Sequence, residues 1–390
     1  MKITAVRATP VNIPFTAPYR FSYGSMASLT KTVVEVDTDA GITGLGEVAD
    51  GDRAADVVTM GEALIGMDIR ETTLAERRVV PQMRYSAWNN GLAARRAFGG
   101  IEMAMWDAYG KIENVPLHTL LGGAVRTEIA LTEYFAYRLP GASEPGQNTP
   151  TEIANFCAKM IEDHGAQWFE GKVATVALSE ELQMVAEVRA AIGERQLQLD
   201  ANGAWTVSTA RSALKKLDRF DIHAYEEPVE TYEELAQLRT VTPASFSSHI
   251  IDLPEAVRHK APDTLVTNLN ELGGIKRATE FIGACARLDV GFRFHSGETG
   301  IASSAYLHVS AAMEHIREPS QTLLRWYGDD VIEQGLLTPK DGHLGVPDGP
   351  GLGVTLDRKA LKRCHERYLE EGKFPSASPS EGYGGSFRKA

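Results

Sequence analysis

The chain has 390 residues, of which 43% are hydrophobic, and its formal net charge is −12 at pH 7. This length and composition predict two or three globular domains with a sizeable core. The negative charge argues against a nucleic-acid partner or an anionic membrane surface, and no apolar run approaches the roughly 20 residues that a membrane helix needs.

The cysteines and the N-terminus indicate the compartment. Cys157, Cys285 and Cys364 are far apart and odd in number, so they form neither a disulfide framework nor a Cys-x-x-Cys metal site. The first residues alternate like a strand and lack the apolar core of a signal peptide. We therefore expect a soluble, cytoplasmic protein.

Residues 1–125 are predicted to form an N-terminal α+β domain. Its strands are expected at 2–13 and on both sides of the turn signal Asp39-Ala40-Gly41, which gives a three-stranded antiparallel start. Loops are expected at 15–29 and at 49–55, and helical patterns follow at 53–66, 71–84 and 92–112.

From about residue 128 the pattern changes to apolar strands that alternate with amphipathic helices. Eight strands are expected, at 129–136, 166–173, 197–201, 222–228, 245–250, 264–269, 291–295 and 321–326. Regular alternation predicts a parallel sheet, and eight units favour an α/β fold with a closed (β/α)8 barrel over residues 126–345. An open doubly wound sheet is the competing fold. The last segment, 346–390, is expected to pack back on the N-terminal domain and to end in an irregular tail.

Polar residues stand at the C-terminal ends of these strands, where barrel enzymes carry their catalytic groups. They are Lys172, Asp200, Glu226 with Glu227, His249, Asn268 and His295. Each alone has an ordinary explanation as a turn residue, a solvated strand end or a core histidine. Six such residues at one end of a barrel instead predict a catalytic site.

The order of these residues also indicates their chemistry. Asp200, Glu226 and His249 lie on consecutive strands, and two carboxylates that converge on one cation favour Mg²⁺ or Mn²⁺. Lys172 and His295 come from strands on opposite sides of that trio. Two bases on either side of a metal suit proton removal and delivery on a carboxylate substrate.

Motifs along the whole chain carry a resemblance to a known family. "TVVEVDTDAGITGLGE", "GIEMAMWDAYGKIENVPLHTLLGG", "FEGKVA", "LDANGAW", "YEEPV", "NLNELGGI" and "FRFHSGETG" follow one another in this order. Together they resemble the mandelate racemase/muconate lactonizing enzymes and the acid-sugar (glucarate) dehydratases of the enolase superfamily. The resemblance implies a TIM-like barrel under an N-terminal capping domain. It also implies metal-dependent removal of the proton α to a carboxylate through an enediolate.

The resemblance assigns roles to single positions. Lys172 matches the second lysine of the family's Lys-x-Lys base motif, and His295 matches the second acid/base. Asp200 and Glu226 match the first two ligands of one divalent ion, with Mg²⁺ expected and Mn²⁺ an alternative, and His249 occupies the third ligand position.

Substrate contacts are expected from both parts of the chain. Tyr23 belongs to the loop expected at 15–29, which resembles a substrate-closing loop of the family. Asn202 matches the asparagine of the "NGAW" motif that contacts substrate in acid-sugar dehydratases. Asn268 and Glu298 complete the expected substrate-binding set.

Three residues depart from the family pattern. Glu170 stands where the family has the first lysine, so Lys172 lacks the usual cationic neighbour. His249 replaces a carboxylate or amide, although imidazole suits Mn²⁺, Fe²⁺ or Zn²⁺ better than Mg²⁺, and Ser248 or a water is the alternative ligand. Asn268 replaces the aspartate that partners the histidine base.

The leading functional hypothesis is dehydration of an acid sugar or related hydroxy acid. The alternative in the same class is a racemase, epimerase or cycloisomerase that uses the same first step. A non-catalytic binding or regulatory homologue is the alternative of another class. In each case we expect a small carboxylate ligand and a homo-oligomer.

Overall fold

The computed structural model describes residues 1–49, 51–81, 89–295 and 297–374. The chain begins with a three-stranded antiparallel sheet in the order β1-β2-β3, which confirms the predicted start. The strands are β1 (Ile3–Phe21), β2 (Gly24–Thr38) and β3 (Thr43–Val48). Gly41 donates its backbone N–H to the Thr38 carbonyl at 3.1 Å and closes the turn between β2 and β3.

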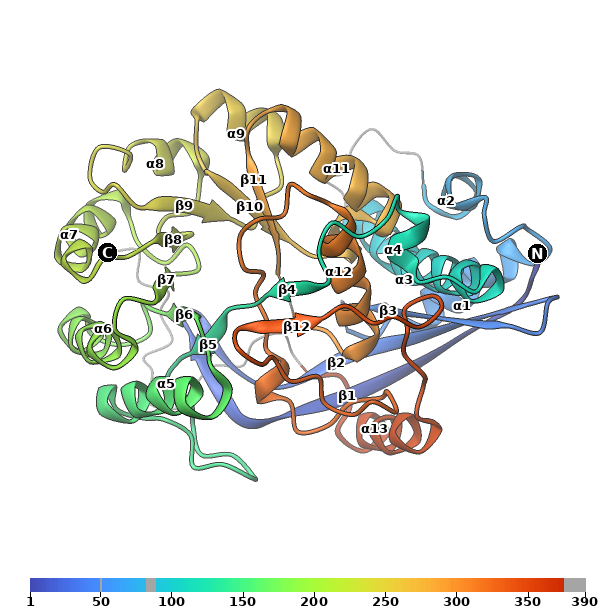
Figure 1. Ribbon diagram of the computed structural model, residues 1–390, viewed down its shortest axis with the longest axis horizontal. Helices are drawn as coiled ribbons and strands as arrows, with labels where there is room; N and C mark the ends of the chain where they lie inside the picture. Colours follow the sequence, from blue (N-terminus) through green and yellow to red (C-terminus); the bar gives the residue numbers. More distant parts are fainter. Residues whose placement is uncertain (50, 82–88, 296, 375–390) are drawn as a thin grey trace.

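The prediction of a loop at 15–29 is wrong, because these residues extend β1 and β2 into one long hairpin. Every second side chain from Val11 to Phe21 is buried, as expected for a strand with one face on the core. The Phe15 ring stacks on Tyr327 with 5.6 Å between centroids. Tyr19 also packs on Trp326, with 5.1 Å between ring centroids, so these aromatic contacts hold the hairpin against the rest of the molecule. Figure 1 shows the long hairpin that β1 and β2 form.

Four helices pack near this sheet: α1 (Ala54–Leu64), α2 (Thr72–Val79), α3 (Asn89–Glu113) and α4 (Leu117–Leu120). The first three confirm the predicted helices, although residues 82–84 of the second prediction lie outside the described residues. A Cβ added at Gly44 would lie 1.9 Å from the Ala104 carbonyl oxygen, and one added at Gly46 would lie 2.0 Å from that of Gly100. Glycine on β3 therefore allows the close approach of α3.

The second part contains a curled seven-stranded parallel sheet in the order β11-β10-β9-β8-β7-β6-β5. Its strands are β5 (Glu133–Phe135), β6 (Trp168–Lys172), β7 (Gln196–Asp200), β8 (Ala224–Glu226), β9 (Ser245–Ser248), β10 (Thr264–Thr267) and β11 (Gly291–Phe294).

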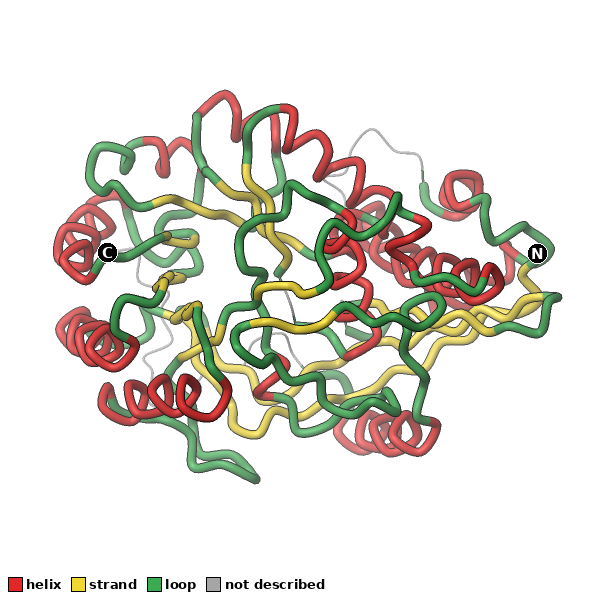
Figure 2. Tube along the Cα trace, in the orientation of Figure 1, coloured by secondary structure: helices red, strands yellow, loops and turns green. Residues whose placement is uncertain are grey.

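Helices surround the strands on the outside, as in a TIM-like barrel (Figure 2). They are α5 (Pro150–His164), α6 (Leu178–Ile192), α7 (Val207–Leu217), α8 (Tyr232–Ala236), α9 (Leu253–His259), α10 (Leu269–Leu272), α11 (Ile275–Arg287) and α12 (Gly300–Ala312), with the short 3-10 helix η1 (Asp218–Phe220) after α7.

The prediction of an eighth strand at 321–326 is wrong. Ser320 alone forms a parallel bridge to Leu131, and Leu324–Trp326 form the 3-10 helix η2. Gln321 donates its N–H to the Phe294 carbonyl on β11 at 2.9 Å, while Ser320 donates its N–H to the Ala130 carbonyl at 3.0 Å. These two residues therefore bridge the gap in the barrel without forming a regular strand.

The expected strand at 129–136 is divided in two. Its start is β4 (Glu128–Ala130), which pairs antiparallel with β12 (His343–Gly345) outside the barrel, and only β5 joins the barrel sheet.

The C-terminal helix α13 (Arg358–Glu371) lies along β1. The Arg367 guanidinium donates to the Asn12 carbonyl at 2.8 Å, and His365 Nδ1 contacts the Pro10 carbonyl oxygen at 2.7 Å. Residues 375–390 of the expected tail lie outside the described residues. The domain boundaries at 125 and 345 stay predictions.

All three cysteines, Cys157, Cys285 and Cys364, are free and buried. None of the helices among the described residues is both long enough and apolar enough to cross a membrane.

Candidate active site

A cavity of about 580 Å³ lies between the barrel and the β1–β2 hairpin. Barrel residues and hairpin residues both line it, so the two parts of the fold share one site. Most of the predicted site residues line this cavity: Tyr23, Lys172, Asn202, His249, Asn268, His295 and Glu298. Asp200 and Glu226 do not line it; they are fully buried and contact the lining residues Lys172, Asn202 and His249.

The strand register places the key side chains in one layer. Lys172 pairs with Asp200 across β6 and β7, and Asp200 pairs with Glu226 across β7 and β8. The Lys172 ammonium forms an ion pair with Asp200 Oδ2. Asn202 donates its backbone N–H to Asp200 Oδ1 at 2.7 Å and its side-chain N–H to Asp200 Oδ2 at 2.9 Å. The strand ends thus bring the predicted base and two predicted metal ligands together.

Three buried carboxylates lie close enough to share a cation. Glu170, Asp200 and Glu226 offer oxygen atoms within 4.8 Å of one another. Burial raises the pKa of Asp200 to about 7, although the Lys172 charge opposes this shift. Carboxylate oxygens are the ligands that Mg²⁺ and Mn²⁺ prefer, so the donor set fits one hard divalent ion.

Two residues that sequence reasoning missed hold these carboxylates. The buried Arg293 guanidinium donates to Glu170 Oε2 at 2.9 Å and to Glu226 Oε2 at 2.7 Å. Gln321 Nε2 donates to Glu170 Oε1 at 2.5 Å and to Glu226 Oε2 at 2.8 Å. The signal for Arg293 was its place two residues before His295, since alternate residues of a strand face the same side.

The two histidines of the site lie edge to face, with 4.9 Å between ring centroids and an interplanar angle of 84°. His249 Nε2 contacts Glu226 Oε1 at 2.9 Å. Burial alone would lower the pKa of His249, but the charge and hydrogen bond of Glu226, together with the charges of Glu227 and Asp200, raise the pKa to about 9. Burial, with the charges of His249 and Lys172, holds the pKa of His295 well below its ordinary value. The surroundings of the two histidines therefore shift their pKa values in opposite directions when no cation is bound.

The remaining predicted substrate contacts differ in their surroundings. Asn268 Oδ1 accepts the Glu271 N–H at 2.9 Å and caps α10. Glu298 is buried, and this burial raises its pKa to about 7. Asn202 Oδ1 is buried without a hydrogen-bond partner among the described residues. Tyr23 is 56% exposed at the hairpin tip and packs on Phe21.

Curated proteins and solved structures resemble the chain over nearly its full length. The probable glucarate dehydratase of Streptomyces coelicolor is 26% identical over 403 residues, which cover 95% of this chain and 93% of that protein. Muconate cycloisomerase 1 of Rhodococcus opacus is 24% identical over 383 residues, 93% of this chain and 98% of that protein.

Two solved structures share the fold. An enolase from Mycobacterium smegmatis complexed with tartrate superposes with a TM-score of 0.88 at 28% identity and covers 95% of this chain and 93% of that one. An enolase from Thermobispora bispora complexed with magnesium and formate gives a TM-score of 0.86 at 29% identity, over 95% and 94% of the two chains.

Two family models match the chain. Residues 3–122 match the mandelate racemase/muconate lactonizing enzyme N-terminal domain, and residues 152–360 match the enolase C-terminal domain-like family. These matches cover the three-stranded sheet and the barrel strands β6 to β11. The chain therefore belongs to the mandelate racemase/muconate lactonizing enzyme family of the enolase superfamily.

Proposed function

We propose that this protein is a metal-dependent lyase that removes the proton α to a substrate carboxylate and eliminates a β-hydroxyl group from an acid sugar or related hydroxy acid. The observation that carries the proposal is the position of Lys172 and His295. Both line one cavity, and their strands β6 and β11 lie on either side of the strands that carry Asp200 and Glu226.

Asp200 and Glu226 would hold one divalent ion, with Mg²⁺ expected and Mn²⁺ an alternative. His249 or Glu170 would be the third ligand, because both lie close to these carboxylates. The ion supplies Lewis acidity that makes the α-proton of a bound carboxylate more acidic. The magnesium in the Thermobispora enolase supports this assignment.

Lys172 would act as the base. It forms an ion pair with Asp200, and when Asp200 coordinates a cation instead, the Lys172 pKa falls toward the range in which a neutral amine is available. The amine takes the α-proton. Protonated His295 would then donate a proton to the β-hydroxyl group, which leaves as water, and the enol product becomes an α-keto acid.

A specific observation favours the alternative in the same class. The low pKa of His295 favours neutral imidazole, and neutral imidazole is a base rather than an acid. A racemase or epimerase would use Lys172 and His295 as bases on opposite faces of the α-carbon. The relative from Rhodococcus opacus is named as a cycloisomerase, which is also an isomerase, and this supports the alternative. A non-catalytic homologue would bind ligand and metal without turnover.

The experiment is a screen of acid sugars and hydroxy acids with Mg²⁺ and Mn²⁺ in parallel, with product analysis by NMR. We expect a keto-acid product from the parent protein and none from Asp200→Asn combined with Glu226→Gln. Metal binding is measured on both proteins by calorimetry. Unchanged metal affinity in the double variant would place the metal site elsewhere, and isomerised product would select the alternative.

The named relatives act on small carboxylates, so a small carboxylate ligand is expected here too. A cytoplasmic location and a homo-oligomer stay predictions, and sedimentation velocity tests the second.

A further inference from the structure

A buried lysine of the capping sheet lines the same cavity. Lys31 lies on β2, where it pairs with Val11, and only 6% of its surface is exposed. Its ammonium donates one hydrogen bond, to the Ala49 carbonyl at 2.8 Å. An ammonium carries three donors, and within the described ranges no carboxylate forms an ion pair with Lys31.

Two other cationic side chains that line the cavity have carboxylate partners. Lys172 pairs with Asp200, and Arg96 pairs with Glu271 at 2.6 Å. Lys31 therefore differs from Lys172 and Arg96 as a buried cation that forms no ion pair with a carboxylate of the described residues. Burying an uncompensated charge is costly, which indicates that a ligand supplies the negative charge.

Lys31 lines the same cavity as His295 and Glu298, and its charge acts on both of these groups. Its charge is one of the influences that lower the pKa of His295. It also opposes the burial that raises the pKa of Glu298 to about 7. Because burial disfavours the charged form of Glu298, this neighbour is a weaker counterion for Lys31 than an ordinary carboxylate.

We propose that Lys31 binds a second carboxylate of the substrate, so that the preferred substrate is a dicarboxylic hydroxy acid rather than a monocarboxylic one. This inference rests on the proposed function, in which the first carboxylate lies beside Asp200 and Glu226. The two ends of the substrate would then contact the two walls of the cavity. Lys31 would favour substrates with a second negative charge, while the barrel residues carry out the proton transfers.

The test compares aldaric and aldonic acids of the same configuration, which differ in one terminal carboxylate, on the magnesium-loaded protein. For the parent we expect a higher kcat/KM with the diacid. Lys31→Met should lower kcat/KM for the diacid roughly 10- to 100-fold, the size expected for one charge-assisted hydrogen bond. It should change the monoacid value by less than about twofold, because that ligand lacks the group that Lys31 binds.

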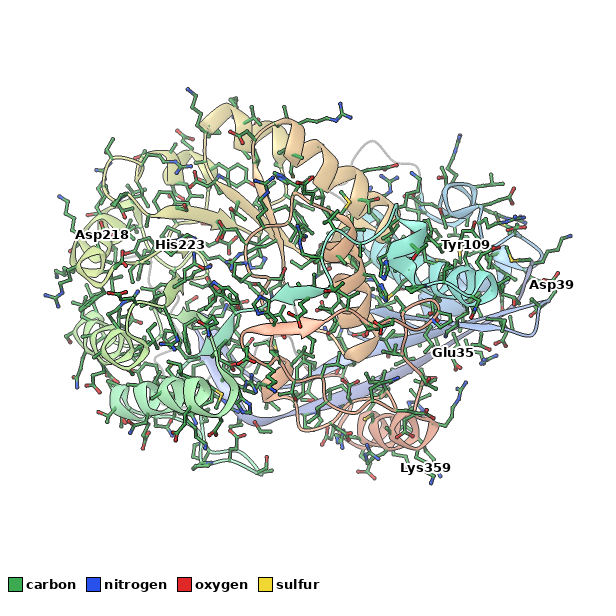
Figure 3. The ribbon with its side chains drawn as sticks, in the orientation of Figure 1. Glu35, Asp39, Tyr109, Asp218, His223 and Lys359 are labelled. Carbon is green, nitrogen blue, oxygen red and sulfur yellow. The ribbon has the colours of Figure 1, made fainter. Side chains whose placement is uncertain are left out.

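Control variants separate charge recognition from structure. Lys31→Arg should restore most of the preference for the diacid, since it keeps the charge. Lys359→Met removes a lysine from the exposed surface of α13 (Figure 3) and should leave both substrates unaffected. Should Lys31→Met fail to fold, as judged by its melting temperature, Lys31→Gln takes its place.

Binding measurements keep the inference testable without turnover. Tartrate and a monocarboxylic hydroxy acid of similar size are titrated calorimetrically into the parent and Lys31→Met in the presence of Mg²⁺. A selective loss of tartrate affinity in Lys31→Met would support the Lys31 site whether or not any compound is turned over. An absence of turnover would count only against the proposed function. Equal effects on mono- and dicarboxylic ligands, or no diacid preference in the parent, would overturn the role of Lys31.

Discussion

The interior of the barrel separates its charged residues into two layers. Glu170 and Lys172 are two residues apart on β6, and Arg293 and His295 are two residues apart at the end of β11. The side chains of each pair therefore face the barrel interior at different depths, one in each layer. In the deeper layer Arg293 forms ion pairs with Glu170 and Glu226. In the upper layer Lys172 and His295 line the cavity. Glu170, which stands where the family has a lysine, is therefore neutralised by the Arg293 guanidinium on β11.

Arg293→Met should destabilise the protein strongly, because it leaves two buried carboxylates without their cation. Breaking a buried ion pair by removing one partner costs about 3–5 kcal/mol. Urea denaturation measures the free energy of unfolding, with Arg287→Met on the exposed side of α11 as the control. Arg293→Lys should recover part of the loss. Equal stability of Arg293→Met and the control variant would show that this pairing contributes little.

The strand-end residues could be predicted from the sequence because an apolar run followed by a polar residue marks a barrel strand end. Lys172, Asp200 and Glu226 were found in this way. Arg293 and Gln321 were not, because their partner Glu170 is more than a hundred positions away and only barrel closure brings them together. Gln321 also lay in a segment expected to be a strand.

Buried carboxylates of the capping part hold the N-termini of two barrel helices. Glu47 on β3 accepts the Thr299 N–H at 3.0 Å and the Ala302 N–H at 3.2 Å, at the start of α12. Glu102 on α3 accepts the Ile275 N–H at 2.8 Å and that of Lys276 at 3.0 Å, at the start of α11. The first N–H groups of a helix lack partners within it, and a negative charge there is favourable. The cap is therefore fixed to the barrel through these helix ends.

Glu102→Ala should reduce the free energy of unfolding by about 2–4 kcal/mol, since each buried donor left without a partner costs about 1–3 kcal/mol. Glu113→Ala at the exposed end of the same helix is the matched control. Thermal and urea unfolding of both variants provide the measurement. A loss no larger than that of the control would mean that water replaces the carboxylate without cost.

Helices and strands could be predicted where the apolar periodicity extended over many residues. They could not be predicted where contacts with distant parts of the chain determine the local structure. The helices α1 and α3 formed where the patterns at 53–66 and 92–112 predicted them. The hairpin at 15–29 contains Gly24 and Ser25, which favour a loop, but its buried aromatic row packs on the barrel and keeps it extended. The segment 321–326 has a strand composition, yet it turns into η2 after two bridging residues.

At the scale of the whole molecule, several buried carboxyl groups make stability depend on pH. Burial raises the pKa of each of these groups to about 7: Glu102, Glu181, Glu298 and Asp330. Because the folded chain binds these protons more tightly than the unfolded chain, stability is lost as pH rises through this range. His249, whose pKa is raised to about 9, loses its contribution in the same direction.

We therefore expect a lower melting temperature at pH 8 than at pH 6.5 when EDTA keeps metal absent. The window begins at pH 6.5 because His295 and His308, whose pKa values are lowered, act in the opposite direction below their ordinary value of 6.5. Glu102→Gln should flatten the decrease, because it removes one titrating group. A melting temperature that rises between pH 6.5 and 8 would contradict this account of the buried carboxyl groups.

The central claim is that Lys172 removes the α-proton of a carboxylate substrate bound beside Asp200 and Glu226, with His295 on the opposite side of the site. Its most direct test is deuterium incorporation at the α-carbon of aldaric acids in D₂O with Mg²⁺, followed by NMR. We predict incorporation by the parent and a loss of at least about 100-fold in Lys172→Met, since a positioned base contributes about 10²–10⁴-fold. His295→Asn should retain exchange on the Lys172 side. Exchange at the parent rate in Lys172→Met, or no exchange by the parent with any aldaric acid, would contradict the claim.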